Sequence, residues 1–307
     1  VTSKRRLAKL VTEGILDGWD YPRMPTLAGL RKRGYPASAI VAFCRDMGVS
    51  KTNARHAIEE LESYVRRDLN KIAQRRMAVL HPTKLTITNW PAGQVDYFDV
   101  MNNPENADDG TRKVAFTGEL YIEAEDFAEV PPPKFYRLSI GREVRLRGAY
   151  FVTATDVVTD DQGNVVEVLA TYDPASQGGN SPDGRKVKST IHWVSRPHAV
   201  EASVALYDRL FTVPEPDADG DFKAHLNPHS LEVIRAKLEP SLVEAAPQGS
   251  SVRERYHGAQ FLTERQICQR YGVSRATANK ALSNLVAEGV LEFRKGIGTF
   301  VRSGMLQ

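Results

Sequence analysis

The sequence contains few cysteines and no long run of apolar residues. Its two cysteines, Cys44 and Cys268, lie far apart in segments with helical periodicity, outside any CxxC pair or Cys/His ligand spacing. A disulfide framework is therefore not expected, and no metal site is predicted. No stretch approaches the roughly 18 apolar residues of a membrane helix, and the start VTSKRRLAKL lacks the apolar core of a signal peptide. The sequence predicts a cytoplasmic protein that does not contact a membrane.

The net charge of +3 conceals an uneven distribution along the 307 residues. Residues 1–80 contain 16 Lys and Arg against 8 Asp and Glu, residues 81–250 contain 16 against 26, and residues 251–307 contain 9 against 4. Basic ends of this kind suit contact with a polyanion, and a merely solvated surface is the alternative. The length predicts two or three domains. Because the chain begins with Val1 and not with Met, we expect a piece of a longer protein.

Helical periodicity dominates the first 75 residues, and short alternating stretches follow it. Three short helices are expected around the apolar stripes at 7–11, 40–44 and 58–69, separated by breaks at 18–26 and 34–36. Strands are expected at 84–90, 118–126, 142–158 and 188–195, with a hairpin over 157–169. Many short strands without intervening helices favour barrels over a parallel sheet.

The end of the chain forms a separate helical unit in this reading. After a linker-like stretch at 243–251, helices are predicted at 263–271 and 274–287, followed by strands at 290–293 and 299–301.

Six stretches in residues 1–245 resemble the C-terminal half of the glutaminyl-tRNA synthetases, which are class I aminoacyl-tRNA synthetases. The stretches are VTSKRRL, GWDYPRMPTLAGLRKRGYP, GREVRLRGAY, DGRKVKSTIHWVS, LYDRLF and AKLEPSL, in family order. Related glutamyl-tRNA synthetases share the architecture, and PRMPT, RKRGY and AKLEPSL favour the glutamine enzyme. The resemblance implies an ATP-dependent ligase whose ATP and Mg²⁺ bind in a domain that precedes this segment. No cofactor and no aminoacylation are therefore expected of this chain alone.

The resemblance also implies roles for basic residues. Ser3, Lys4 and Arg5 would match the family's flexible MSKR loop, whose lysine contacts ATP phosphates. The residues that would contact the anticodon are Arg75, Arg137, Arg145 and Arg147, and those near tRNA backbone phosphates are Arg31 and Arg33. If residues 145 and 147 share a strand, their side chains project to one face. The alternative is that these arginines pair with carboxylates of the acidic middle segment.

Two further motifs of this region are diagnostic of the family but are expected to be structural. Asp183-Gly184-Arg185 reads as a turn, and His192-Trp193 reads as part of a buried strand. No Ser/Asp pattern around the histidine indicates a catalytic triad.

The stretch LTERQICQRYGVSRATANKALSNLVAEGVLEFRKGIGTFV, residues 262–301, resembles the winged helix-turn-helix of GntR-type bacterial regulators. In such a domain the second helix enters the major groove and the wing approaches the backbone. The resemblance implies DNA-binding roles for Arg265, Arg275, Thr277, Asn279, Lys280, Lys295 and Gly296. A winged helix used only for protein contact is the alternative.

Together these features predict a multidomain α+β protein. A short helical subdomain covers residues 1–77, a mainly β double anticodon-binding barrel with an incomplete second part covers 78–245, and a linker with a small winged helix-turn-helix covers 246–307. The predicted function is binding of glutamine tRNA, with DNA as a possible second partner. The alternatives are a DNA-binding transcription regulator and an artificial join of two sequences.

Overall fold

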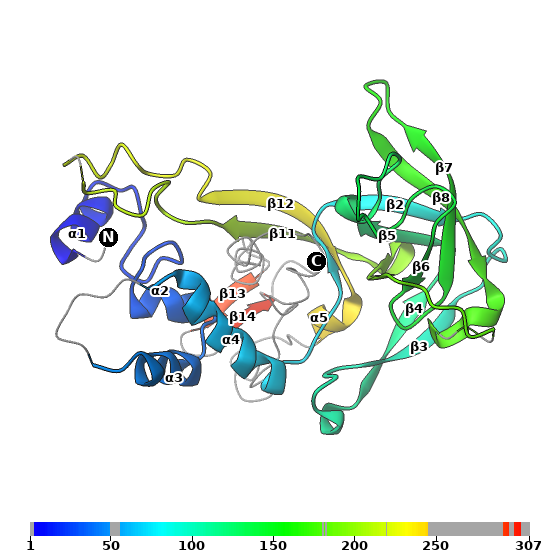
Figure 1. Ribbon diagram of the computed structural model, residues 1–307, viewed down its shortest axis with the longest axis horizontal. Coiled ribbons are helices and arrows are strands. Elements are labelled where there is room, and N and C mark those ends of the chain that lie inside the picture. Colours follow the sequence, from blue (N-terminus) through cyan, green and yellow to red (C-terminus); the bar gives the residue numbers. More distant parts are fainter. Residues whose placement is uncertain are drawn as a thin grey trace. The chain divides into compact units, whose positions relative to one another are not determined.

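The structure is a computed structural model that describes residues 3–49, 56–179, 181, 183–218, 220–244, 291–294 and 298–301 (Figure 1). Up to residue 244 the described chain divides into two compact units. One contains residues 3–75 and 203–234, and the other contains 76–202 and 235–244. The first unit is thus assembled from two stretches that lie far apart in the sequence.

The first unit contains four helices where three were expected. They are α1 (Lys4–Thr12), α2 (Leu27–Lys32), α3 (Ala37–Met47) and α4 (Ile58–Ile72). The additional helix, α2, has only six residues, which is too short to produce a periodic apolar pattern. Its start is fixed by Thr26, whose side chain accepts a hydrogen bond from the backbone N–H of Gly29 at 2.9 Å. A Cβ at position 29 would lie 2.3 Å from the Met24 carbonyl oxygen, so only glycine fits there.

Two small apolar clusters stabilise the first unit. Leu7 and Leu10 of α1 pack with Leu210 and Phe222, which explains why residues 203–234 belong to this unit. The second cluster joins α3 to α4 and contains Tyr35, Ala39, Leu61, Val65, Leu69 and Ala73. Its α4 members recur every four residues, as the sequence pattern predicted.

The second unit is mainly β, which confirms the predicted class for this region. Its strands are β1 (Ala78–Val79), β2 (Pro82–Ile87), β3 (Asp96–Met101), β4 (Thr111–Phe116), β5 (Glu119–Glu123), β6 (Glu143–Leu146), β7 (Phe151–Thr159), β8 (Val165–Asp173), β9 (Thr190–Ile191) and β10 (Val194–Ser195). Seven of them form one sheet in the order β10-β5-β2-β8-β7-β6-β9, and β3 pairs with β4 separately. The pairs β2–β8 and β6–β9 are parallel, and the pairs β10–β5, β5–β2, β8–β7 and β7–β6 are antiparallel.

Short 3-10 helices complete the loops of this unit. They are η1 (Ala107–Asp109), η2 (Ala124–Asp126), η3 (Pro174–Gly179) and η4 (Arg196–His198).

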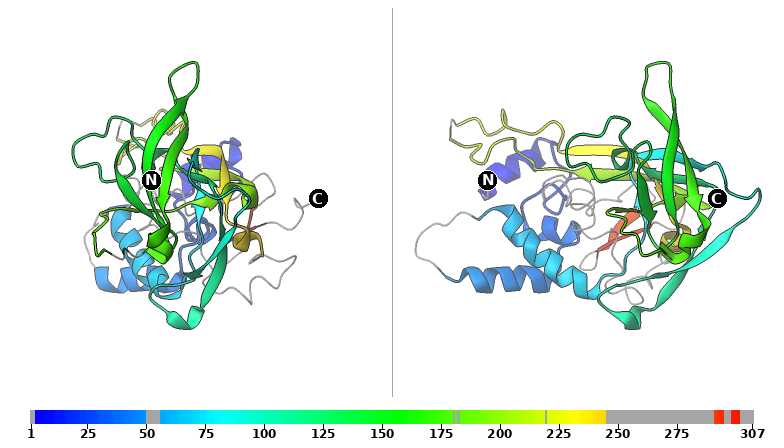
Figure 2. Two further views of the ribbon diagram at one scale, coloured as in Figure 1. Left: turned by 90° about the vertical axis from the view of Figure 1, so that its right-hand side faces the viewer. Right: turned by 45° about the vertical axis from the view of Figure 1, so that its right-hand side comes forward.

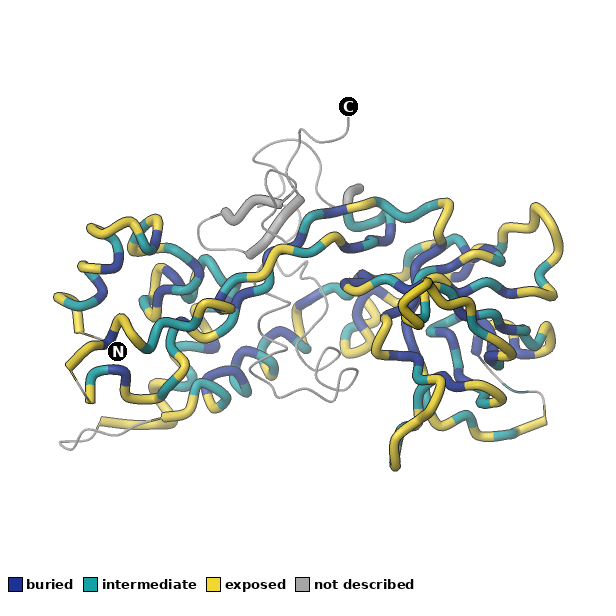
Figure 3. Tube along the Cα trace, turned by 90° about the horizontal axis from the view of Figure 1, so that it is seen from above, coloured by how far each residue is buried: buried dark blue, intermediate teal, exposed yellow. Residues whose placement is uncertain are grey.

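The core of the second unit lies between the large sheet and the β3–β4 hairpin. Alternate residues of the strands are buried, so buried and exposed positions follow each other along the trace (Figure 3). Phe98 and Phe116 of the hairpin form edge contacts with each other and with Tyr150. Trp193 is fully buried against Phe116, which confirms the predicted burial of this motif. The strand predicted over 188–195 was wrong in its extent, because His192 and Trp193 separate the two short strands β9 and β10.

Two further strand predictions needed correction. The stretch 142–158 forms two strands and not one, because residues 147–150 turn, with Gly148 at φ +68°. The β3–β4 hairpin was missed. The hairpin predicted at 157–169 is confirmed as β7–β8, which projects from the sheet in each view (Figures 1 and 2).

Of the predicted second barrel, the described residues contain only a three-stranded sheet with the order β1-β12-β11. It includes β11 (Val200–Tyr207) and β12 (Leu231–Leu238), and the helix α5 (Pro240–Glu244) follows it. Directly after β12, the buried Glu239 carboxylate accepts hydrogen bonds from the Met77 backbone N–H at 2.9 Å and from Arg112. The end of β12 is thereby tied to the start of the second unit.

The predicted wing is confirmed as an antiparallel pair of strands. β13 (Leu291–Arg294) pairs with β14 (Gly298–Val301), with Leu291 opposite Val301 and Arg294 opposite Gly298. The helices predicted at 263–271 and 274–287 lie outside the described residues. So do all the proposed DNA-binding residues, which are Arg265, Arg275, Thr277, Asn279, Lys280, Lys295 and Gly296.

Candidate nucleic-acid interface

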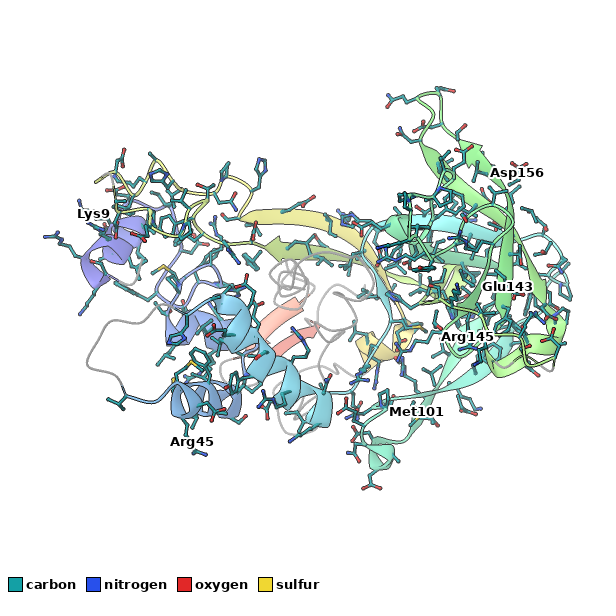
Figure 4. All side chains as sticks on the ribbon, in the orientation of Figure 1. Lys9, Arg45, Met101, Glu143, Arg145 and Asp156 are labelled. Atoms are coloured by element: carbon teal, nitrogen blue, oxygen red, sulfur yellow. The ribbon has the colours of Figure 1, made fainter. Side chains whose placement is uncertain are left out.

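The candidate interface is one face of the sheet formed by β6, β7 and β9. In β6, Val144 and Leu146 point into the core, and the partly exposed Glu143 and Arg145 alternate with them (Figure 4). Arg145 is the register partner of Phe151 in β7 and of Thr190 in β9. Because register partners project to the same side of a sheet, these residues lie together on the outer face.

Arg145 is held in a fixed position without an ion pair. Its guanidinium lies 5.1 Å from the centre of the buried Phe151 ring, in cation–π geometry. A Cβ at position 179 would lie 3.1 Å from its Cδ, so Gly179 leaves room for the arginine stem. Within the described part of the chain, no residue accepts a hydrogen bond from its buried Nε or pairs with its charge. The guanidinium is therefore oriented by packing while its charge stays uncompensated.

Arg185 lies on the same ring but is bound by carboxylates. Its guanidinium is 5.2 Å from the Phe151 ring centre and donates to Glu143 at 2.9 Å, to Asp183 at 2.7 Å and to Asp173. These contacts hold the pKa of Arg185 above its ordinary value. The Ser181 hydroxyl and then Arg185 lower the pKa of Asp183 to about 2. The turn predicted at Asp183-Gly184-Arg185 is present, with Gly184 at φ +70°. The sequence did not predict that Arg185 would bind three carboxylates.

Arg137 pairs with a carboxylate, as the alternative to anticodon contact predicted. Its Nη1 donates to the Glu125 backbone carbonyl at 2.9 Å, and its Nε lies 3.5 Å from the carboxylate of the buried Asp126. The side chain is mostly covered, and its orientation is set by η2. If Arg137 binds RNA, it does so through the part of its guanidinium that does not contact η2.

Arg147 is not in the strand that contains Arg145. β6 ends at Leu146, and Arg147 opens the turn to β7, so the expectation of a shared strand was wrong. The physical reason is the tight turn through Gly148, in which the Ala149 N–H donates to the Leu146 carbonyl at 3.0 Å. The backbone of Arg147 stays fixed, because its N–H donates to Ile191 at 2.9 Å and its carbonyl accepts from the Trp193 indole at 3.1 Å.

The remaining predicted tRNA residues lie in the first unit. Arg31 is exposed in the last turn of α2, and Arg33 directly follows that helix, 5.5 Å from the Tyr35 ring centre. Arg75 donates to the Asn70 side chain at 3.2 Å.

The residues matched to the MSKR loop are also in the first unit. Lys4 and Arg5 are exposed in the first turn of α1, and Ser3 directly precedes the helix. The resemblance placed all three in a flexible loop, but the helix starts at Lys4, because Leu7 and Leu10 bury one face of it.

Positive charge is concentrated around the candidate face. Residues 131–147 and 181–190 together contain eight Lys and Arg and two Asp and Glu, although residues 81–250 are acidic as a whole. Both of these acidic residues, Glu143 and Asp183, bind Arg185. Lys186 and Lys188 are exposed, and the sequence analysis did not name them as candidate binding residues. Their alternation with Val187 could have indicated that both lysines project to the same side. The face therefore presents uncompensated cations, as a polyanion site requires.

In the part of the chain that the structure describes, no helix is long and apolar enough to span a membrane, and no three His, Cys, Asp or Glu side chains lie together as metal ligands would.

Comparison with protein families matches four consecutive parts of the chain. Residues 1–71 match the catalytic domain of "tRNA synthetases class I (E and Q)". Residues 73–173 and 190–252 match two anti-codon binding domains of the same class. Residues 252–301 match "Bacterial regulatory proteins, gntR family".

Comparison with curated proteins gives relatives named glutamine-tRNA ligase. The protein of Rhodopirellula baltica is 55% identical over 249 residues, which cover 80% of this chain and 41% of that protein. The protein of Nitrobacter hamburgensis is 51% identical over 253 residues, covering 82% and 45%, and that of Clostridium kluyveri is 49% identical over 245 residues, covering 79% and 44%. The chain spans less than half the length of these relatives. Residues 1–71, 73–173 and 190–252 are thus similar to the class I (E and Q) tRNA synthetases, and residues 252–301 are similar to the gntR family.

Proposed function

We propose that residues 1–252 bind the anticodon region of a glutamine tRNA. The identity of 55% to a protein named glutamine-tRNA ligase supports this proposal. The observation that carries it is Arg145, a positioned guanidinium without a carboxylate partner among the described residues, in the most basic part of an otherwise acidic unit.

The chemistry of Arg145 suits an RNA loop. A guanidinium offers a planar fork of donors that can bind a phosphate or a base edge with two parallel hydrogen bonds. Stacking on Phe151 fixes the plane of that fork before the ligand arrives, which reduces the entropy lost on binding. Unpaired loop bases are the part of an RNA that such a fork can reach. We include Arg137 and Arg147 as proposed contacts of the same surface.

The activity of the whole protein is part of the same proposal. In a complete glutamine-tRNA ligase, ATP together with Mg²⁺ would activate the amino acid. We propose that this reaction takes place in the cytoplasm. Within this chain, the exposed ammonium of Lys4 and the guanidinium of Arg5 have the charge to contact ATP phosphates. Arg31, Arg33 and Arg75 are proposed phosphate or anticodon contacts of the first unit.

Filter binding with a glutamine tRNA transcript tests the proposal. We expect Arg145→Ala to weaken binding by about tenfold or more, since charge-assisted hydrogen bonds contribute about 1.5–3 kcal/mol. The matched control is Arg235→Ala, which removes a 75% exposed arginine from a surface pair with Glu201 in the same unit. Equal affinity of both variants and the unaltered chain would contradict the proposed site.

A second candidate function is DNA binding by residues 252–301. The gntR match and the antiparallel wing of β13 and β14 support it. Selection of random DNA by the full chain should enrich one motif, and Arg275→Ala should abolish the enrichment. Recovery of unenriched sequences would leave protein contact as the role of this segment.

A further inference from the structure

Tyr136 is an exposed aromatic residue beside the candidate face. Its side chain is 53% exposed, although a tyrosine usually buries most of its ring. The Lys188 ammonium lies over this ring, 5.4 Å from its centre. An exposed ring paired with a cation is typical of surfaces on which unpaired nucleic-acid bases stack.

The loop that carries Tyr136 is anchored on both sides. Before it, the Phe135 N–H donates to the Pro132 carbonyl at 3.1 Å, and the Phe135 carbonyl accepts from the Arg142 side chain. After it, the Leu138 N–H donates to the Asp126 carbonyl at 2.9 Å. The ring is thus displayed from a fixed backbone, so little conformational entropy would be lost when a ligand stacks on it.

A chain of contacts connects Tyr136 to the face that contains Arg145. Lys188 lies over the ring, and its neighbour Ser189 accepts a hydrogen bond from the Arg145 backbone N–H at 2.9 Å. The next residue, Thr190, is the register partner of Arg145. Lys186, Lys188 and Thr190 are exposed and alternate with less exposed residues, so they share one side of this segment. The ring therefore contacts a lysine of the segment that pairs directly with the strand of Arg145.

We propose that Tyr136 is a stacking platform for one unpaired base of the anticodon loop, with Lys188 placed to contact the phosphate of the same nucleotide. This inference rests on the proposed function, because it adds a base-stacking site to the tRNA surface around Arg145. An unpaired base fits better than an apolar protein segment, since the surroundings are cationic and a nucleotide supplies both a flat ring and a negative charge.

The test uses the full chain and anticodon stem-loop RNAs of glutamine tRNA, each with 2-aminopurine at one loop position. Stacking of this fluorescent base on a tyrosine quenches it, so the unaltered chain should quench one position more than the others. Tyr136→Ala should remove that quenching and weaken binding by about 5- to 150-fold, the change that corresponds to about 1–3 kcal/mol per stacked base. Tyr136→Phe keeps the ring and should stay within about twofold of the unaltered chain.

Each outcome decides the inference. Loss of position-specific quenching in Tyr136→Ala, with retention in Tyr136→Phe and an unchanged melting temperature, supports the stacking platform. Equal binding and quenching by Tyr136→Ala, together with weakened binding by Arg145→Ala, overturns the platform and leaves the tRNA site intact. Equal losses in both Tyr136 variants would assign the effect to the hydroxyl and overturn stacking. Failure of the unaltered chain to prefer this RNA to an unrelated hairpin overturns the proposed function and the platform together.

Discussion

Replacing Arg112 with alanine should destabilise the second unit strongly. Arg112 donates to the Glu239 carboxylate through Nε at 2.5 Å and through Nη2 at 2.8 Å. The two side chains are only 10% and 2% exposed. Arg112→Ala would leave a buried carboxylate whose remaining hydrogen-bond donors include the Met77 backbone N–H and the Ser241 hydroxyl. The end of β12 would then lose its main connection to the β3–β4 hairpin.

The expected loss follows from the burial of this pair. Removing one partner of a buried ion pair costs about 3–5 kcal/mol, because the other charge stays buried. Arg76 stays 3.8 Å from the Glu239 carboxylate and compensates part of its charge, so we expect the lower end, about 3 kcal/mol. A loss of that size is a large fraction of the 5–15 kcal/mol that stabilises a typical domain.

Urea unfolding followed by tryptophan fluorescence measures this loss, since Trp193 is buried in the core of the same unit. The matched control is Lys113→Ala, which removes the neighbouring cation in a pair with Asp99 whose lysine is 68% exposed. An exposed pair of this kind contributes about 0–1 kcal/mol. If Arg112→Ala lost no more free energy of unfolding than Lys113→Ala, the buried pair would not stabilise the unit as described.

Two further predictions concern acid stability and backbone packing. The folded pKa of Asp183 is lowered to about 2 against about 3.9 in an unfolded chain, so its contribution is present above about pH 4 and lost as the pH falls toward 2. Asp183→Asn should therefore flatten the decrease of the urea midpoint between about pH 4 and pH 2, and an unchanged slope would exclude this carboxylate as a source. Gly29→Ala should lower the melting temperature of the first unit, because the added Cβ meets the Met24 carbonyl at 2.3 Å and overpacking typically costs about 1–3 kcal/mol. An unchanged melting temperature would show that α2 shifts without strain.

Sequence patterns correctly predicted those elements whose formation depends on residues close together in the sequence. The β7–β8 turn was predicted from its polar residues, and Asp160 indeed accepts hydrogen bonds from the backbone N–H groups of Gln162 and Asn164 at 2.9 and 2.8 Å. The wing strands β13 and β14 were predicted for a similar reason, as two short apolar stretches around a glycine-rich connection. α2 was missed because six residues do not make a periodic pattern.

The candidate site depended on contacts that sequence spacing does not contain. Arg185 binds carboxylates at positions 143, 173 and 183, which only the folding of the sheet brings together. Because those carboxylates bind Arg185, Arg145 has no carboxylate partner among the described residues. Arg137 differs in this respect, since it pairs with Asp126. The family resemblance pointed to both residues, and only the structure distinguishes their surroundings.

The affinity of the full chain for glutamine tRNA, compared with transcripts carrying one substituted anticodon base, tests the central claim most directly. If the anticodon is read at the face around Arg145, each substitution at a contacted base should weaken binding, and Arg145→Ala should remove part of this discrimination. Equal affinity for all transcripts, with the same salt dependence, would show that the chain binds RNA only through its overall charge and would contradict the account.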